Sequence, residues 1–302
     1  MASEKAIVCV HGAGPKPPRE QLLTFWRDAI VQGLQRGHPQ AVQNFETAHF
    51  QMLYWADEVG VDHHDYDLAL DLQQRQQVLE RLGQLQKTRE FRRRHYDALP
   101  GKTALKEFLM DSAAMAGLGG LIWPRVMPEL AAYWQDSNSW AANIRARLNR
   151  VVTEHLDQGR EVVLISHCMG AVISYDALCE LNTEHRLSRW LTLGSPLSSN
   201  AIRNRLLQAP TGSDAHYPPN ILEWHNLAAE DDYVCHDKTV ANDFSAMLDR
   251  RLIGDIRDYT IYNLAVRYGR SNPHHSSGYL THPRTAELLA EWLTRDRATE
   301  CD

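Results

Sequence analysis

The chain lacks the features that mark several classes of protein. It has five cysteines, an odd number, and no two of them form a CxxC pair. Cysteines scattered in this way argue against a disulfide framework and for a reducing compartment. No apolar run approaches the roughly 20 residues of a transmembrane helix, and residues 1–10 show no signal-peptide pattern. These absences predict a cytoplasmic protein without a transmembrane segment.

A strong excess of charge of one sign is also missing. The formal net charge is −6 over 302 residues, so nothing indicates a nucleic acid or another polyanion as a partner. Glycine-rich nucleotide-binding motifs are absent, because the turn HGAGPKP at residues 11–17 matches neither GxGxxG nor GxxxxGK(S/T). No cofactor is therefore predicted. The length allows one large domain or two ordinary ones.

One stretch organises the rest of the chain, Glu161–Cys179, with the sequence EVVLISHCMGAVISYDALC. The apolar run Val162–Ile165 predicts a strand that is buried on both faces of a parallel sheet. Apolar residues at helical spacing follow it, so the strand would turn directly into a helix at Cys168. Small residues two positions to either side, Ser166 and Gly170, leave room for this tight turn. The alternative is an ordinary buried cysteine on a parallel strand.

Strands alternate with helices along the remaining sequence. Strands are predicted at Ala6–Val10, Phe45–Trp55, Arg189–Leu193, Ile221–Leu227 and Tyr259–Val266. Helices are predicted between Pro18 and Gly37, at Ser139–Gln158 and at Pro283–Leu293. This alternation indicates an α/β fold with a doubly wound, mostly parallel sheet. The loops that follow the strands would then meet along one edge of the sheet.

Residues 57–136 differ from this pattern. Asp65–Ala98 is rich in Gln and Arg with leucines at helical spacing, and Ala104–Trp134 is small and apolar. We predict a helical insertion that either forms a cap over the site or packs on the core or on a second subunit. Four of its residues resemble metal ligands: His63, His64, Asp65 and Asp67. A solvated helix start explains them as well, and no metal is predicted.

The turn at Cys168 resembles the nucleophile elbow of the α/β-hydrolase superfamily, with cysteine where serine usually stands and Ser166 in place of the first glycine. Two further segments, the Gly194-Ser195-Pro196 turn and Ala228–Val234, are similar to the lipase and serine-esterase branch. The resemblance covers residues 5–55 and 137–295. It implies an α/β-hydrolase fold in which residues 1–302 form a single domain, with 57–136 as the insertion.

The resemblance also implies a catalytic triad in the chain order nucleophile, acid, histidine, namely Cys168, Asp232 and His275. For the acid, Asp232 is favoured because Asp232-Tyr233-Val234 matches the D-x-V pattern that follows the acid-bearing strand in many members of the superfamily. Asp231 is the alternative. For the histidine, the adjacent His274 is the alternative. We favour His275 because it lies nearer to the closing helix.

A third implied feature is an oxyanion hole. An HG-type turn after an early strand supplies one of its backbone N–H groups in the superfamily, and Gly12 and Ala13 stand in such a turn. The residue after the nucleophile, Met169, would supply the other donor.

The predicted activity is hydrolysis of a carboxylic ester or thioester through a covalent acyl-enzyme. Its partner would be a small-molecule acyl substrate, and the insertion could also join a homo-oligomer. Two other functions stay open: an acyltransferase that uses the same acyl-enzyme, and a catalytically silent homologue that binds a ligand.

Overall fold

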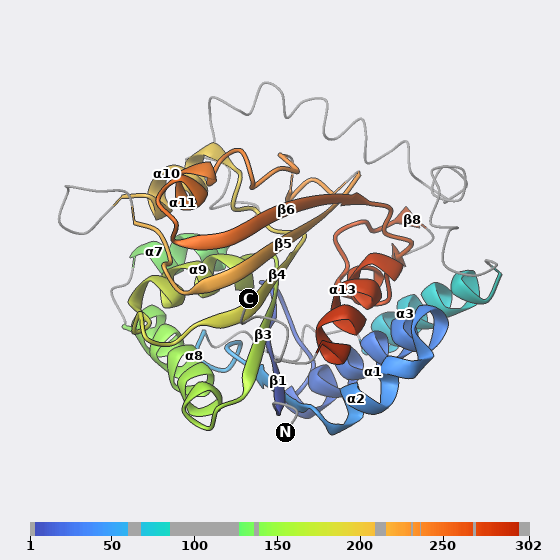
Figure 1. Cartoon of the computed structure of the whole chain (residues 1–302). Coiled ribbons are helices and arrows are strands. Elements are labelled where there is room, and N and C mark those ends of the chain that lie inside the picture. The colour runs from blue at the N-terminus through green and yellow to red at the C-terminus, as the bar shows by residue number, and fades with distance from the viewer. Residues whose placement is uncertain are drawn as a thin grey trace.

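Six parallel strands form the central sheet. The computed structural model describes residues 4–59, 68–84, 127–135, 139–208, 216–230, 232–235, 237–267 and 270–295. The strand order is β2-β1-β3-β4-β5-β6, and every neighbouring pair is parallel. The strands are β1 (Lys5–Val10), β2 (His49–Leu53), β3 (Glu161–His167), β4 (Leu187–Leu193), β5 (Ile221–Ala229) and β6 (Ile253–Ile261). The predicted α/β class with a mostly parallel sheet is confirmed (Figure 1).

Helices lie against the sheet from two sides, with α8 and α9 on one side and α1 and α13 on the other (Figure 1). The described helices are α1 (Arg19–Gly37), η1 (Pro39–Ala41), α2 (Val42–Thr47), α3 (Leu68–Gln84), α7 (Pro128–Gln135), α8 (Trp140–Asp157), α9 (Met169–Glu180), α10 (Asn200–Leu206), α11 (Ser245–Asp249), α12 (Ser276–Leu280) and α13 (Pro283–Thr294). A separate antiparallel pair is formed by β7 (Val266–Arg267) and β8 (Arg270–Ser271).

The core has two halves, one on each side of the sheet, and β1 contributes to both. Successive side chains of a strand point to opposite faces. Ala6, Val8 and Val10 therefore pack with residues of α8 and α9, whereas Ile7 and Cys9 pack with residues of α1 and α13. Because both faces are covered, the strand is apolar from Ala6 to Val10, as the sequence predicted.

The helices predicted from periodic apolar residues are present. All four residues of the stripe on α1 are buried: Leu22, Trp26, Ile30 and Leu34. α8 begins at Trp140, one residue after the predicted start, and Gly159 follows its end with a φ of +74°. α13 begins at Pro283 as predicted, and His282 caps it by accepting a hydrogen bond from the Arg284 N–H at 3.0 Å. These elements depend on local sequence alone, which is why their bounds could be predicted.

Two strand predictions need correction. Phe45–Trp55 is not one strand, because Val42–Thr47 is helical and only His49–Leu53 pairs with β1. Phe45 is fully buried from that short helix, and its apolar character was mistaken for a strand signal. The late strand is Ile253–Ile261 rather than Tyr259–Val266.

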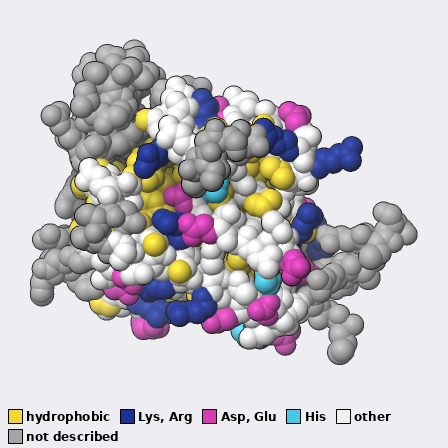
Figure 2. Space-filling view, turned by 90° about the vertical axis from the view of Figure 1, so that its left-hand side faces the viewer, with side chains coloured by type: hydrophobic (Ala, Val, Ile, Leu, Met, Phe, Trp, Pro, Cys, Tyr) yellow, Lys and Arg dark blue, Asp and Glu magenta, His cyan; other side chains and the backbone are white. Residues whose placement is uncertain are grey.

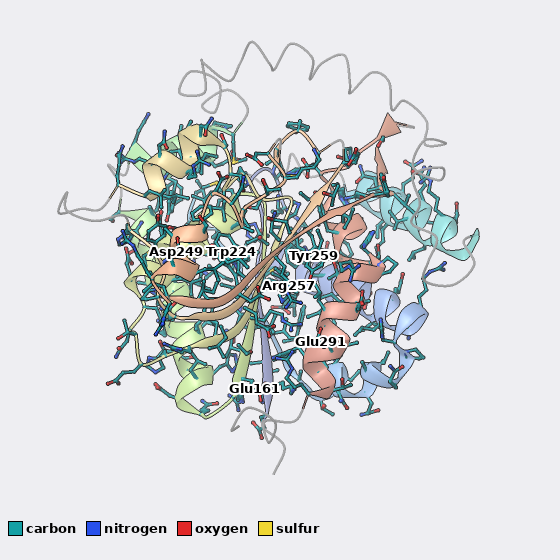
Figure 3. The ribbon with its side chains drawn as sticks, turned by 45° about the horizontal axis from the view of Figure 1, so that its top comes forward. Glu161, Trp224, Asp249, Arg257, Tyr259 and Glu291 are labelled. Atoms are coloured by element: carbon teal, nitrogen blue, oxygen red, sulfur yellow. The ribbon has the colours of Figure 1, made fainter. Side chains whose placement is uncertain are left out.

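The reason for the second error is that β6 lies at the edge of the sheet. Only Ile253, Ile256 and Ile261 of its nine residues are buried, so it has no continuous apolar run. Figure 3 shows that Trp224 on β5 lies on the side of α11, whereas Tyr259 on β6 lies toward α13. Pairing with β5 along its whole length, from Ile253 to Ile261, is what defines the strand.

Of the predicted insertion at 57–136, the structure describes α3, α7 and residues 57–59 and 127. α3 packs Val78 against Ala265, and its Arg75 forms an ion pair with Asp28 at 2.6 Å. The suggested metal ligands at 63–67 and the apolar stretch up to residue 126 lie outside the described residues. The alternatives of a cap and a packing surface therefore stay open.

Acidic and basic side chains are interspersed on the face seen in Figure 2, on the side of α10 and α11. Among the described helices, none has the length and hydrophobicity that crossing a bilayer requires. The described ranges also contain no group of three or more His, Cys, Asp or Glu side chains that could hold a metal ion.

Candidate active site

Cys168 occupies the sharp turn between β3 and α9. Its backbone has φ +55° and ψ −127°, a conformation that a side chain other than glycine rarely adopts. Such a conformation costs on the order of 1–3 kcal/mol and persists only where the surroundings impose it. The Cys168 N–H donates to the Leu193 carbonyl at 3.0 Å, which ties the turn to β4. The predicted strand-to-helix apex is therefore present at Cys168.

Glycines allow the chain to approach itself at this turn. A Cβ on Gly170 would lie 2.5 Å from the Val10 carbonyl oxygen, so only glycine fits where α9 passes β1. A Cβ on Gly12 would lie 2.6 Å from the Cβ of Cys168, so the turn after β1 touches the cysteine directly. Ser166 is fully buried beneath the turn, where its hydroxyl accepts a hydrogen bond from the Trp190 indole at 3.0 Å.

Asp232 follows β5, and its side chain is fully buried. Both carboxylate oxygens contact Nδ1 of His274, at 2.9 and 2.8 Å. The Tyr279 hydroxyl donates to Oδ2 at 2.6 Å, and the Val234 N–H donates to Oδ1 at 3.0 Å. The carboxylate is thus surrounded by hydrogen-bond donors that fix its position. The alternative acid, Asp231, lies outside the described residues.

The two adjacent histidines point to different partners. His274 contacts Asp232, whereas His275 caps α12, with its Nδ1 2.7 Å from the Ser277 hydroxyl oxygen. Our sequence-based choice was His275, but the residue that the structure brings to Asp232 is the alternative, His274. The backbone turns at this point, with the His275 N–H donating to the Asn272 carbonyl at 3.1 Å, and the two side chains leave the turn in different directions.

His274 also interacts with Cys168. Burial alone would lower its pKa, but the negative charges of Asp232 and Cys168 and the hydrogen bonds to both raise the pKa well above the usual value. Because Nδ1 faces Asp232, the other ring nitrogen, Nε2, is the one available to the thiol. The side chain of His274 is 17% exposed and Cys168 is 4% exposed, so the pair lies just below the surface.

The turn His11-Gly12-Ala13 is held by the His11 side chain. Nδ1 of His11 lies 2.9 Å from the Gly12 carbonyl oxygen, and Nε2 accepts a hydrogen bond from the Trp55 N–H at 3.1 Å. The Trp55 indole in turn donates to the His11 carbonyl at 2.8 Å, with the two rings stacked. Burial, with a contribution from Lys16, lowers the pKa of His11 to about 3. This imidazole is therefore neutral, with its proton on Nδ1.

This arrangement orients the predicted oxyanion donors. A trans peptide unit points its carbonyl and N–H in opposite directions, so the Ala13 N–H is directed away from His11. The Met169 N–H begins α9 and has no partner within the helix. Neither amide has a hydrogen-bond acceptor in the described part of the chain. Ala13 follows Gly12, which contacts Cys168, and Met169 follows Cys168 itself. Both N–H groups therefore belong to residues beside the Cys168 turn, where the carbonyl oxygen of a substrate would need hydrogen-bond donors.

The turn is also fixed from outside. The Gly14 N–H donates to the carboxylate of Glu129, at the start of α7, at 2.8 Å. The Lys16 ammonium donates to the Ala13 carbonyl at 2.6 Å. Glu129 of α7 therefore holds the loop that carries Gly12 and Ala13. Ser195 has the turn role that the sequence suggested, because its hydroxyl accepts a hydrogen bond from the Leu197 N–H at 3.2 Å.

Sequence reasoning missed three residues that support this site: His167, Tyr279 and Asn263. Tyr279 had a signal, because it is an aromatic residue between the histidine pair and the closing helix. For His167, alternation along β3 indicated only that its side chain faces away from that of Ser166. Nothing in the local sequence of Asn263 indicated its contacts.

Comparisons of the chain with models of protein families, with curated proteins and with solved structures found no significant match. Any function assigned to the protein therefore depends on the geometry of Cys168, His274 and Asp232.

Proposed function

We propose that the protein is a cofactor-independent hydrolase of carboxylic esters or thioesters, with Cys168 as nucleophile, His274 as general base and acid, and Asp232 as the residue that orients His274. The observation that carries the proposal is the chain of contacts from the strained Cys168 through His274 to the buried Asp232. The proposal also includes the fold family: a single, doubly wound α/β-hydrolase domain with a helical insertion at 57–136.

In this mechanism, Nε2 of His274 accepts the thiol proton and the Cys168 sulfur attacks the acyl carbon. The negative charge that develops on the carbonyl oxygen is bound by the N–H groups of Ala13 and Met169. His274 then gives the proton to the leaving alcohol or thiol, and a thioester acyl-enzyme forms. A water molecule, deprotonated by His274, attacks this thioester and releases the carboxylic acid and the free thiol.

The electrostatics of the site suit a thiol nucleophile. A free cysteine titrates near about pH 8.5, so only a minority is thiolate at neutral pH. His274 lies beside the sulfur as a base that can take the thiol proton, and Asp232 stabilises the imidazolium that then forms. Because a thiolate leaves a tetrahedral intermediate more easily than an unprotonated alkoxide, thioesters and activated esters are the favoured substrates.

The first test is the reactivity of the cysteines toward iodoacetamide, followed by mass spectrometry of the peptides. Burial raises the pKa of the thiols of Cys9, Cys179 and Cys235. Cys168 is expected to be alkylated first at pH 7, and its reaction should slow in His274→Ala but not in His275→Ala. Equal labelling of Cys168 in wild type and His274→Ala would contradict the proposal.

The second test is turnover of a panel of nitrophenyl esters and acyl thioesters of graded chain length. Wild type should hydrolyse part of the panel, and Cys168→Ala should lose turnover by several orders of magnitude. Cys179→Ser is the matched control, since Cys179 lies on α9 and away from the contacts of the triad. If an added amine becomes acylated, the protein is a transferase, and if no member of the panel is turned over, it is a silent binding protein.

Location in the cytoplasm and assembly through the insertion stay predictions.

A further inference from the structure

His167 ends β3 and directly precedes the proposed nucleophile. It is 8% exposed, and Nε2 donates to the backbone carbonyl of His274 at 2.9 Å. The two imidazole rings lie 4.8 Å apart. The Trp26 ring and the Tyr279 ring lie beside His167, with ring centroids at 6.4 and 5.9 Å. The side chain is therefore confined, and its hydrogen bond goes to the loop of residues 273–275, here called the histidine loop.

Asn263 holds the same loop from the other direction. It is fully buried after β6, and its Nδ2 donates to the carbonyls of Pro273 and His275, both at 2.9 Å. Its Oδ1 accepts the Ala265 N–H at 2.9 Å, which fixes the orientation of the amide. A Cβ on Gly278 would lie 1.6 Å from Oδ1, so the glycine leaves the space that Asn263 occupies.

Three consecutive carbonyls, those of Pro273, His274 and His275, are thus bound by two buried side chains. We propose that His167 and Asn263 are positioning residues, which clamp the backbone of His274 so that its Nε2 stays at the Cys168 thiol. This inference rests on the proposed function. His167 directly precedes Cys168 in the chain, so its hydrogen bond to the His274 carbonyl links His274 to the residue beside the nucleophile. The distance between the thiol and the imidazole is then fixed by this bond as well as by the histidine loop.

The charge of His167 is compatible with this role. Burial, with a contribution from His274, lowers the pKa of His167 well below the usual value. Two adjacent imidazolium ions would repel each other, so a neutral His167 lets His274 take up and release its proton. With its proton on Nε2, the ring remains a donor to the His274 carbonyl throughout that cycle.

The test compares His167→Phe with His167→Gln. Phenylalanine keeps the shape of the ring and removes the donor, whereas the glutamine amide nitrogen reaches about as far as Nε2 and keeps it. The first readout is the pH midpoint of alkylation of Cys168, and the second is kcat and KM on the best substrate of the panel. In His167→Phe we expect the midpoint to move to higher pH, because the imidazolium stabilises the thiolate less well.

The same variant should lose about 10- to 100-fold in kcat with little change in KM, the range expected for a catalytic group displaced by about 1 Å. His167→Gln should recover most of the wild-type midpoint and kcat. The matched control is His225→Phe, which replaces another buried histidine of the sheet, with contacts to Tyr259 and Glu223, and should leave the midpoint in place. Thermal unfolding of each variant shows that it is folded under the assay conditions.

Asn263→Asp is a second, independent variant in case His167→Phe does not fold. It keeps the oxygen that accepts from Ala265 and places a second oxygen against two carbonyls, so it should move the midpoint in the same direction. A wild-type midpoint and kcat in folded His167→Phe or Asn263→Asp would overturn the clamp. If His274→Ala moves the midpoint and neither clamp variant does, only this inference fails. If His274→Ala does not move it either, the proposed function fails.

Discussion

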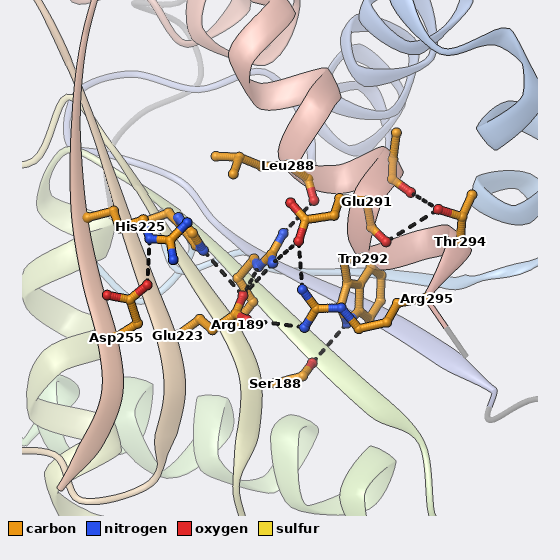
Figure 4. Close-up of polar contacts among 12 residues, drawn as sticks. Ser188, Arg189, Glu223, His225, Asp255, Leu288, Glu291, Trp292, Thr294 and Arg295 are labelled. Atoms are coloured by element: carbon orange, nitrogen blue, oxygen red, sulfur yellow. Dashed lines mark hydrogen bonds and ion pairs between the residues drawn. The ribbon is translucent and has the colours of Figure 1, made fainter. Parts of the chain in front are cut away.

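Buried charged side chains lie at both ends of the parallel strands: at the amino-terminal ends, here called the amino edge, and at the carboxyl-terminal ends, the carboxyl edge. The two groups of side chains differ in their partners. At the amino edge, Arg189 on β4 is 1% exposed and bonds to the Glu223 carboxylate and to the Leu288 carbonyl (Figure 4). Arg295 also reaches Glu223 at 3.1 Å, and Glu291 of α13 completes the network. At the carboxyl edge, Asp232 is equally buried, but its partner His274 is a group that can exchange a proton.

The difference separates a structural network from a reactive one. At the amino edge the Glu223 carboxylate is shared by Arg189, Arg295 and His225, and this network ties α13 to the sheet. A hollow of about 290 Å³ opens there, lined among others by Arg160, Glu161 and Arg295. Its charged side chains are largely engaged with each other, for example Arg295 with Glu223. At the carboxyl edge the ion pair faces a thiol instead.

The largest expected effect is at the carboxyl edge. Asp232→Asn should preserve the fold and lower kcat by about 10⁴-fold, because an amide favours the wrong tautomer of the histidine. Steady-state turnover of the best ester or thioester measures the loss. Asp231→Asn is the matched control and should remain near wild type. A larger loss in Asp231→Asn than in Asp232→Asn would assign the acid to the neighbouring residue.

The next effect is at the amino edge and should appear in stability rather than in kcat. Arg189→Met removes the buried partner of Glu223 and should lower the free energy of unfolding by about 3 kcal/mol. Urea unfolding at pH 7 measures this change, with kcat of the folded variant retained. Arg284→Met, which removes an exposed ion pair with Glu287, should cost less than about 1 kcal/mol. Equal losses in the two variants would contradict a structural role for Arg189.

A smaller effect concerns His282, which caps α13, and the dependence of the free energy of unfolding on pH. Burial lowers the pKa of His282 to about 3 from its ordinary 6.5. The folded state therefore keeps His282 neutral while the unfolded chain takes up a proton. The stability that this provides is complete above pH 6.5 and is lost as the pH falls toward 3. At pH 5 the loss is about 2 kcal/mol.

His282→Asn tests this pH dependence, since asparagine caps helices well and does not titrate. The variant should match wild type at pH 8 and lose less of its free energy of unfolding between pH 8 and pH 5. The measurement is urea unfolding at both pH values. An unchanged slope with pH would show that His282 is protonated in the folded protein.

The smallest effect is expected for Tyr279→Phe. The hydroxyl donates to Asp232 and accepts from the Ala229 N–H at 2.9 Å, but Asp232 keeps its contacts with His274 and Val234. We expect kcat/KM to fall about tenfold, the effect of one hydrogen bond to a charged group. Tyr175→Phe is the control, because its hydroxyl bonds to the His216 carbonyl instead. A loss as large as that of Asp232→Asn would mean that the hydroxyl itself takes part in the chemistry.

Local patterns were sufficient for much of the fold. The apolar run of β3, the small Ser166 and Gly170, and the helix after them predicted the turn at Cys168. The stripes of α1 and α13 predicted their bounds to within one or two residues. These features repeat over a few residues, because burial of one helix face or both faces of a strand is recorded in neighbouring positions. β6 was misplaced because an edge strand records burial only at every second position or less.

The choice between the two histidines could not be made in this way. His274 and His275 share one local sequence, and their roles differ because Asn263, His167 and Asp232 bind one orientation of the loop. Two of these three partners lie 107 and 42 positions from His274. The sequence alone therefore decided the four inner strands of the sheet, the helices α1, α8, α9 and α13 and the cysteine at its turn, since these depend on local periodicity. The histidine that meets the cysteine was decided only by tertiary hydrogen bonds, which join residues that no local pattern connects.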